Sequence, residues 1–185
     1  MAKQKNPDYS AQLVTGECFA SFPHLAEPDQ GQYGNNQYKL DAILFHDDDK
    51  NTAFKKAIME HAKTAPSTKG VDPSDLKLPW KDGNTGSVTK YAGYSDHFYI
   101  SPTTNNAPVV VDVNKKPIPG DAVYGGAVVR VAVVAKAYDI NGNKGVKLYL
   151  NSVQFVRDSE RFGPGGSVPF DDAYSTEDTS DDEGF

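Results

Sequence analysis

The fold of this chain follows from residues 127–157, whose sequence is AVVRVAVVAKAYDINGNKGVKLYLNSVQFVR. Apolar residues recur at alternate positions over residues 127–138 and again over residues 146–157. Residues 139–145 between them are rich in Gly and Asn, which is the composition of a hairpin turn. The stretch therefore predicts two long antiparallel strands, each with an apolar face that packs against a core.

Basic and aromatic residues occupy the opposite face of both strands. The first strand places there Arg130, Lys136 and Tyr138, and the second places there Lys147, Tyr149 and Arg157. Aromatic rings stack on bases for about 1–3 kcal/mol per base without reading sequence, and Lys and Arg neutralise phosphates. The pattern is typical of a surface that binds single-stranded nucleic acid. The same residues also fit a core position or a plain solvated sheet face.

The remainder of the folded region is expected to contain shorter strands and one helix. The strands are expected at residues 12–19, 37–45, 88–94, 97–101 and 109–113. Apolar residues recur at helical spacing over residues 51–63, and Asp49 or Asn51 can cap the start of this helix. Residues 23–36 and 67–86 are expected to be irregular. The long strands and the chain length of 185 residues predict a mainly β fold, a small and strongly bent barrel with one inserted α-helix.

Two further segments supply aromatic and basic candidates for binding. Trp80 and Lys81 follow a Leu-Pro pair, and Trp80 fits either the core or a stacking platform on a loop. The densest aromatic stretch contains Tyr91, Tyr94, Phe98 and Tyr99. A small barrel cannot bury four such rings from neighbouring positions on opposite faces. At least one of them is therefore expected to face outward.

The C-terminal residues predict a separate tail. Residues 1–162 form the expected domain, residues 163–170 a Gly- and Pro-containing linker, and residues 171–185 an acidic tail. The tail carries seven acidic residues and no basic one, so it should be disordered. The four residues expected to bind a partner protein are Asp181, Asp182, Glu183 and Phe185.

The tail also changes how the net charge of −6 is interpreted, because its seven acids exceed that charge and leave residues 1–170 at +1. The nearly neutral body can still carry a basic groove, which the tail can occupy until a polyanion displaces it. The sequence shows no signal peptide and no apolar run long enough to span a bilayer, so we expect no membrane partner and a cytoplasmic protein. Cys18 is the single cysteine, so no internal disulfide is expected.

We expect no cofactor, metal or catalytic residue, and two alternatives to nucleic-acid binding stay open. The first is a magnesium-dependent nuclease that uses the acids in His46-Asp47-Asp48-Asp49, although helix capping explains these acids more simply. The second is a protein-interaction module whose tail mimics DNA. Its body would lack a basic groove.

Several motifs together resemble a family of phage single-stranded DNA-binding proteins with an OB fold, known from Enterobacter phages. They include GECFASF at residues 16–22, WKDGN at residues 80–84, VYGG at residues 123–126 and AKAY at residues 135–138, in the same order over most of the body. One departure is His46, where the family strand usually ends on a Lys.

The resemblance implies an elaborated OB-fold barrel that coats single-stranded DNA during replication or recombination in the host cytoplasm. It also implies an acidic tail that modulates DNA binding and recruits phage or host replication and recombination proteins. It does not imply an enzyme.

Overall fold

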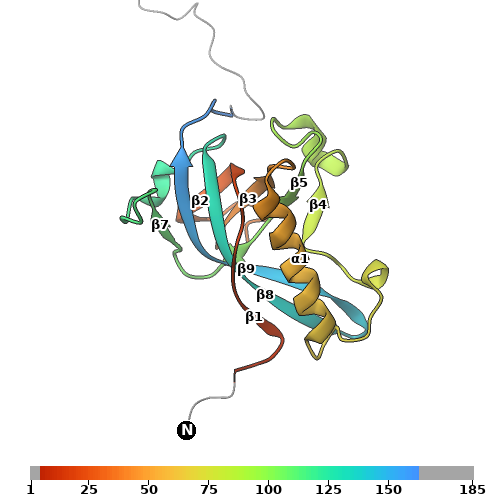
Figure 1. The fold of residues 1–185 in the computed structure, drawn as a ribbon. Helices are drawn as coiled ribbons and strands as arrows, with labels where there is room; N and C mark the ends of the chain where they lie inside the picture. The colour runs from red at the N-terminus through yellow and green to blue at the C-terminus, as the bar shows by residue number, and fades with distance from the viewer. Residues whose placement is uncertain (1–4, 163–185) are drawn as a thin grey trace, which may run out of the picture.

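A computed structural model of the protein describes residues 5–162 (Figure 1). The predicted linker and tail, residues 163–185, lie outside the described residues. The described strands are β1 (Tyr9–Val14), β2 (Cys18–Asp29), β3 (Gln37–Leu44), β4 (Trp80–Asp82), β5 (Phe98–Ile100), β6 (Thr103–Thr104), β7 (Val109–Val111), β8 (Val128–Ile140) and β9 (Asn143–Arg157). The helices are α1 (Asp49–Thr64) and short 3₁₀ helices at Pro73–Asp75, Gly86–Lys90 and Gly120–Ala122.

The strands form one sheet that closes on itself. The order is β1-β8-β2-β3-β6-β9-β7, and β8 also pairs with β9, which closes the ring. Strand β5 joins the sheet on β3, and β4 pairs with β5. The prediction of a mainly β fold with one inserted helix is confirmed.

The predicted long hairpin is strands β8 and β9, which pair along almost their whole length. Val129, Val131 and Val133 are fully buried, whereas Arg130 and Lys136 are only partly buried, so the predicted faces are confirmed. The register shifts between Ala132 and Val133. The extra residue is Asn151 of β9, because Ala132 pairs with Ser152 and Val133 with Leu150, and such a bulge bends the strand that carries it.

Four local predictions were wrong. Residues 67–86 are not all irregular, because they contain β4. Residues 88–94 form no strand, since Gly86–Lys90 is a 3₁₀ helix and Gly93 adopts a positive φ of 90°. Residues 12–19 are not one strand, because the chain turns between β1 and β2. Residues 23–36 are not all loop, because β2 continues to Asp29 through two register shifts against β3.

The core lies inside the closed sheet and beneath α1. Phe54, Ile58 and Ala62 of α1 are buried against it, and α1 contacts β1, β8 and β9 (Figure 1). A second, smaller cluster on the other side of β3 consists of Ile43, Tyr94 and Tyr99. Within the described residues, no helix is both long and apolar enough to cross a membrane.

Asp48 caps α1, in place of the expected Asp49 or Asn51. Its carboxylate accepts hydrogen bonds from the backbone N–H groups of Lys50 and Glu17, both at 2.8 Å. The bond from Glu17 is the main reason why the pKa of Asp48 lies below its usual range. Because both carboxylate oxygens already bind backbone donors, this residue has a structural role and is a poor metal ligand.

Candidate nucleic-acid interface

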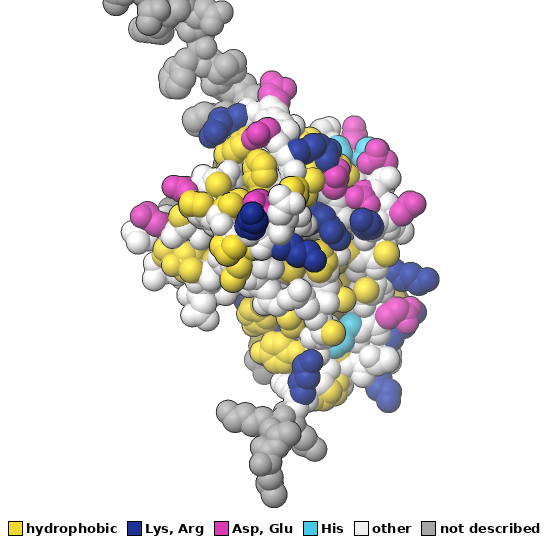
Figure 2. All heavy atoms as spheres, turned by 60° about the vertical axis from the view of Figure 1, so that its left-hand side comes forward, with side chains coloured by type: hydrophobic (Ala, Val, Ile, Leu, Met, Phe, Trp, Pro, Cys, Tyr) yellow, Lys and Arg dark blue, Asp and Glu magenta, His cyan; other side chains and the backbone are white. Residues whose placement is uncertain are grey.

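A groove of about 570 Å³ lies between the β8–β9 hairpin and the segment that leads into β4. Four lysines and two tyrosines line it: Lys77, Lys81, Lys136, Lys147, Tyr138 and Tyr149. No Asp or Glu lines it among the residues that the structure describes. On the face in Figure 2, basic side chains lie among acidic ones. The groove is therefore a local concentration of positive charge, which attracts a polyanion.

Lys136 and Lys147 lie directly opposite each other on β8 and β9. Like charges at directly opposed positions of an antiparallel pair are destabilising. On the same face, the adjacent cross-strand pairs are Tyr138 with Gly145 and Val134 with Tyr149. None of these four residues supplies a carboxylate that could compensate the two positive charges. This unfavourable pair is understandable if an anion binds between the two ammonium groups.

Tyrosine rings lie beside these lysines. Tyr9 of β1 stacks with Tyr149, with ring centroids 6.2 Å apart and an interplanar angle of 26°. The Nζ of Lys136 lies 5.2 Å from the Tyr9 ring centroid, and that of Lys147 lies 5.3 Å from the Tyr149 centroid. Alternating rings and cations of this kind can stack bases and bind phosphates of the same strand.

Gly145 allows the far wall of the groove to come close to the hairpin. Lys77 donates its N–H to the Lys144 carbonyl oxygen, and its own carbonyl oxygen accepts from Val146, both at 3.0 Å. A Cβ on Gly145 would lie 2.6 Å from the Lys77 carbonyl oxygen and 2.6 Å from the Tyr138 hydroxyl. The absence of a side chain at Gly145 therefore brings Lys77 and Tyr138 to the same groove.

We expect Gly145→Ala to widen the groove and to destabilise the protein by about 1–3 kcal/mol, because the backbone of Lys77 must move. Single-stranded DNA affinity should fall several-fold. Gly125→Ala is the matched control, since a Cβ there would lie no closer than 3.7 Å to its nearest neighbour. Thermal unfolding and DNA titration measure both effects, and equal behaviour of the two variants would contradict this account of Gly145.

The structure brings five of the sequence-predicted residues together in the groove: Lys81, Lys136, Tyr138, Lys147 and Tyr149. Two others lie on the predicted face but elsewhere. Arg130 Nε donates to the Thr15 carbonyl oxygen at 3.0 Å and lines a separate hollow of about 250 Å³ beside α1. Arg157 Nη1 pairs with Glu17 Oε1 at 2.6 Å. We therefore leave both arginines out of the proposed interface.

Trp80 packs against the main core, on the opposite side of β4 from Lys81. The Nζ of Lys55 lies 5.4 Å from the Trp80 ring centroid and 4.1 Å from that of Phe98. Burial lowers the pKa of Lys55. The partly buried Trp80 thus packs against the core, and its role as a stacking platform stays a prediction.

The aromatic stretch after residue 90 is mostly buried. Tyr94 is completely buried and donates its hydroxyl to Asp41 Oδ2 at 2.5 Å, and Tyr99 is 8% exposed. Burial raises the pKa of both phenols. A base cannot reach either ring, so we withdraw both as stacking platforms. Phe98 is 42% exposed, which confirms that at least one of the four rings faces outward.

Sequence reasoning missed Lys77, which lines the groove, and Tyr9, whose ring lies beside it against Tyr149. Tyr9 lies before the strand predicted at residues 12–19, and Lys77 lies in the segment expected to be irregular. Tertiary pairing places both residues, since Tyr9 is opposite the groove residue Lys136 and Lys77 forms a bridge with Gly145. Their only sequence signal is residue type, a tyrosine and a lysine outside the predicted strands.

A closed β sheet with basic and aromatic side chains on its outer face is an arrangement that proteins use to bind single-stranded nucleic acid. The family described as Enterobacter phage Enc34 ssDNA-binding protein matches residues 11–184 of this chain. The chain therefore belongs to this family, and the resemblance seen in the sequence is confirmed.

One curated relative is putative protein p50 of Acyrthosiphon pisum secondary endosymbiont phage 1. It is 37% identical over 83 residues, which are 44% of this chain and 45% of that protein. The match thus spans less than half of the relative's length.

Solved structures of single-stranded DNA-binding proteins share the fold. The protein of bacteriophage Enc34 in complex with ssDNA has a TM-score of 0.65 and 23% identity, covering 82% of this chain and 89% of that one. A further structure of the Enc34 protein has a TM-score of 0.64 and 24% identity, covering 89% and 90%. Bacteriophage T7 gp2.5, also a single-stranded DNA binding protein, has a TM-score of 0.51 and 18% identity, covering 83% and 90%. The family and these neighbours are DNA-binding proteins rather than enzymes, in agreement with the prediction.

Proposed function

We propose that this protein binds single-stranded DNA without sequence preference in the groove between β4 and the β8–β9 hairpin. The observation that carries the proposal is the opposed pair Lys136 and Lys147 with the stacked rings of Tyr9 and Tyr149 beside it. Stacking and phosphate contacts do not read base edges, so affinity should depend on strand length and salt rather than on sequence.

Family membership supports this assignment, and the Enc34 relative was solved in complex with ssDNA. We propose further that the chain adopts the OB-type barrel that the sequence resemblance implies. Its place of action would be the cytoplasm of a phage-infected host, where it coats exposed strands during replication or recombination.

The acidic tail, residues 171–185, has two proposed roles. Its seven carboxylates compete with phosphates for the lysine groove, and its terminal residues bind a replication or recombination protein. The composition of the tail supports the first role, and the aromatic ring of Phe185 among the acids Asp181, Asp182 and Glu183 supports the second.

The direct test is fluorescence titration of labelled oligo-dT by the wild-type protein and by Tyr149→Ala. Loss of one stacking ring should weaken binding by roughly tenfold, because such a platform contributes about 1–3 kcal/mol. The salt dependence should stay unchanged, since no cation is lost. Tyr33→Ala is the matched control, because this ring is 82% exposed at the tip of the β2–β3 hairpin and outside the groove.

Affinity that hardly changes with salt in the wild-type protein would contradict the proposal. If the protein does not bind oligo-dT even after residues 171–185 are removed, it is instead a protein-interaction module whose tail mimics DNA. Loss of oligo-dT integrity in the presence of Mg²⁺ would instead identify a nuclease.

A further inference from the structure

Phe22 has an unusual backbone conformation and an exposed ring. It adopts a φ of 45°, and it is 45% exposed. This region is rarely occupied by a bulky residue, and the following Pro23 normally pushes the preceding residue toward extended conformations. Strain of this kind costs on the order of 1–3 kcal/mol and persists mainly at binding and switch sites.

The Phe22 ring belongs to a small exposed cluster. It packs edge-on against Tyr91, with ring centroids 4.9 Å apart. The Nζ of Lys90 lies 5.2 Å from the Tyr91 ring centroid. Two rings and one ammonium group repeat the chemistry of the lysine groove, where Lys147 lies beside Tyr149.

Side-chain contacts connect this cluster to the groove. Ser101, which lines the groove, donates its hydroxyl to Asp41 Oδ1 at 2.7 Å. The other oxygen of Asp41 accepts from Tyr94, whose ring centroid lies 6.4 Å from that of Tyr91. A chain of side-chain contacts therefore runs from the groove to the Phe22 cluster through Asp41 and the buried Tyr94.

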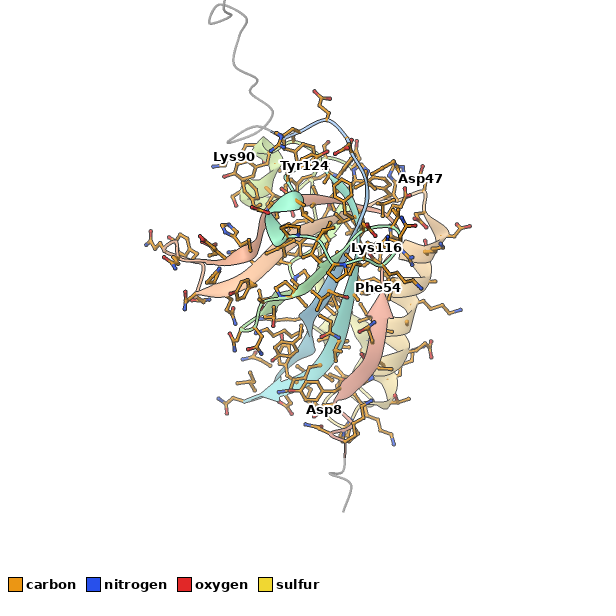
Figure 3. All side chains as sticks on the ribbon, turned by 90° about the vertical axis from the view of Figure 1, so that its left-hand side faces the viewer. Asp8, Asp47, Phe54, Lys90, Lys116 and Tyr124 are labelled. Atoms are coloured by element: carbon orange, nitrogen blue, oxygen red, sulfur yellow. The ribbon has the colours of Figure 1, made fainter. Side chains whose placement is uncertain are left out.

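The groove and the Phe22 cluster lie toward opposite ends of the molecule. Figure 3 shows Lys90 at one end and Asp8 at the other, next in sequence to Tyr9, which pairs with the groove residue Lys136. A single strand that contacts both parts would run along this length of the molecule, and single-stranded DNA sites on such folds cover about 4–16 nucleotides.

We propose that Phe22, Tyr91 and Lys90 form a second stacking site for the single strand held in the groove. The proposal rests on the proposed function. Its ligand is an unpaired base on Phe22 and Tyr91 with a neighbouring phosphate near Lys90. The strained backbone of Phe22 holds the ring outward for this contact.

The test compares two lengths of oligo-dT on the full chain. An oligonucleotide of about 5 nucleotides fills the groove only, whereas one of about 15 reaches the second site. Phe22→Gly should weaken binding of the long strand by roughly tenfold and leave binding of the short strand unchanged. The variant should unfold at the same or a higher temperature, because Gly adopts a positive φ without strain.

Phe98→Ala is the matched control, because Phe98 is exposed to nearly the same extent, 42%, but lies beside Lys55 of α1. It should bind both lengths normally. Lys90→Ala provides a second, exposed variant that should lower affinity for the long strand only and flatten its salt dependence by about 0.7. Normal affinity of both Phe22→Gly and Lys90→Ala for the long strand would overturn the second site, whereas failure of the wild-type protein to bind either length would overturn the proposed function itself.

Discussion

Replacing Lys147 with Glu should weaken single-stranded DNA binding by about a hundredfold and leave the fold at least as stable. Lys147 lies directly opposite Lys136, so the new carboxylate would pair with the remaining ammonium group. Two phosphate contacts would then be lost by one substitution. The slope of log affinity against log salt should flatten by about 1.4, since each neutralised phosphate contributes about 0.7 for a single strand.

Stability should change in the opposite direction from binding. A repulsive cross-strand pair becomes an attractive one, and such pairs contribute about 0.2–1 kcal/mol. Oligo-dT titration over a salt series and thermal unfolding measure the two effects on the same preparation. A substitution that damaged the fold would instead lower both quantities together.

Lys56→Glu is the control, because it makes the same change in net charge at an exposed position of α1. It should lower affinity only slightly, through the general field of the protein. If Lys56→Glu weakens binding as much as Lys147→Glu, the effect is one of net charge, and the DNA does not bind between the two opposed lysines.

The long hairpin could be predicted from the sequence because its signal is local. Valines at alternate positions from Val129 to Val133 and a turn rich in Gly and Asn specify two strands and their buried faces. The helix could be predicted equally well from the sequence, because its buried residues recur at helical spacing. These patterns do not predict which residues of one strand face lie close enough together to form one site. Arg130 and Lys136 share a face, yet they lie six residues apart, roughly 20 Å along β8.

The failed strand at residues 88–94 shows the limit of composition as a guide. Its aromatic and β-branched residues favour a strand, but tertiary contacts decide the outcome. Tyr94 is buried, where its hydroxyl donates a hydrogen bond to Asp41 and its ring packs edge-on against Tyr99. Composition also fails to predict the groove. Lys77 lines it, and Tyr9 lies beside it, only because segments distant in sequence pair with the hairpin.

Removing residues 171–185 should tighten single-stranded DNA binding by about tenfold at low salt. Seven carboxylates on a short tether act at a high local concentration on the four lysines that phosphates must reach. The difference from the full chain should shrink as salt rises, because salt screens the tail and the DNA alike. Equal or weaker affinity after truncation would mean that the tail does not compete for the groove.

Deletion of Phe185 alone separates the two proposed roles of the tail. The seven acidic side chains remain, and Gly184 takes over the terminal carboxylate, so competition for the groove should be almost unchanged and DNA affinity should match that of the full chain. The proposed binding of a replication or recombination protein through the tail would depend instead on the Phe185 ring, because a buried aromatic anchor can contribute more than about 2 kcal/mol to an interface. Pull-down of such proteins should therefore fall sharply in the deletion while oligo-dT titration stays the same. If DNA affinity rises as much as it does after removal of the whole tail, the ring rather than the charge holds the tail in the groove, and the two roles share one contact.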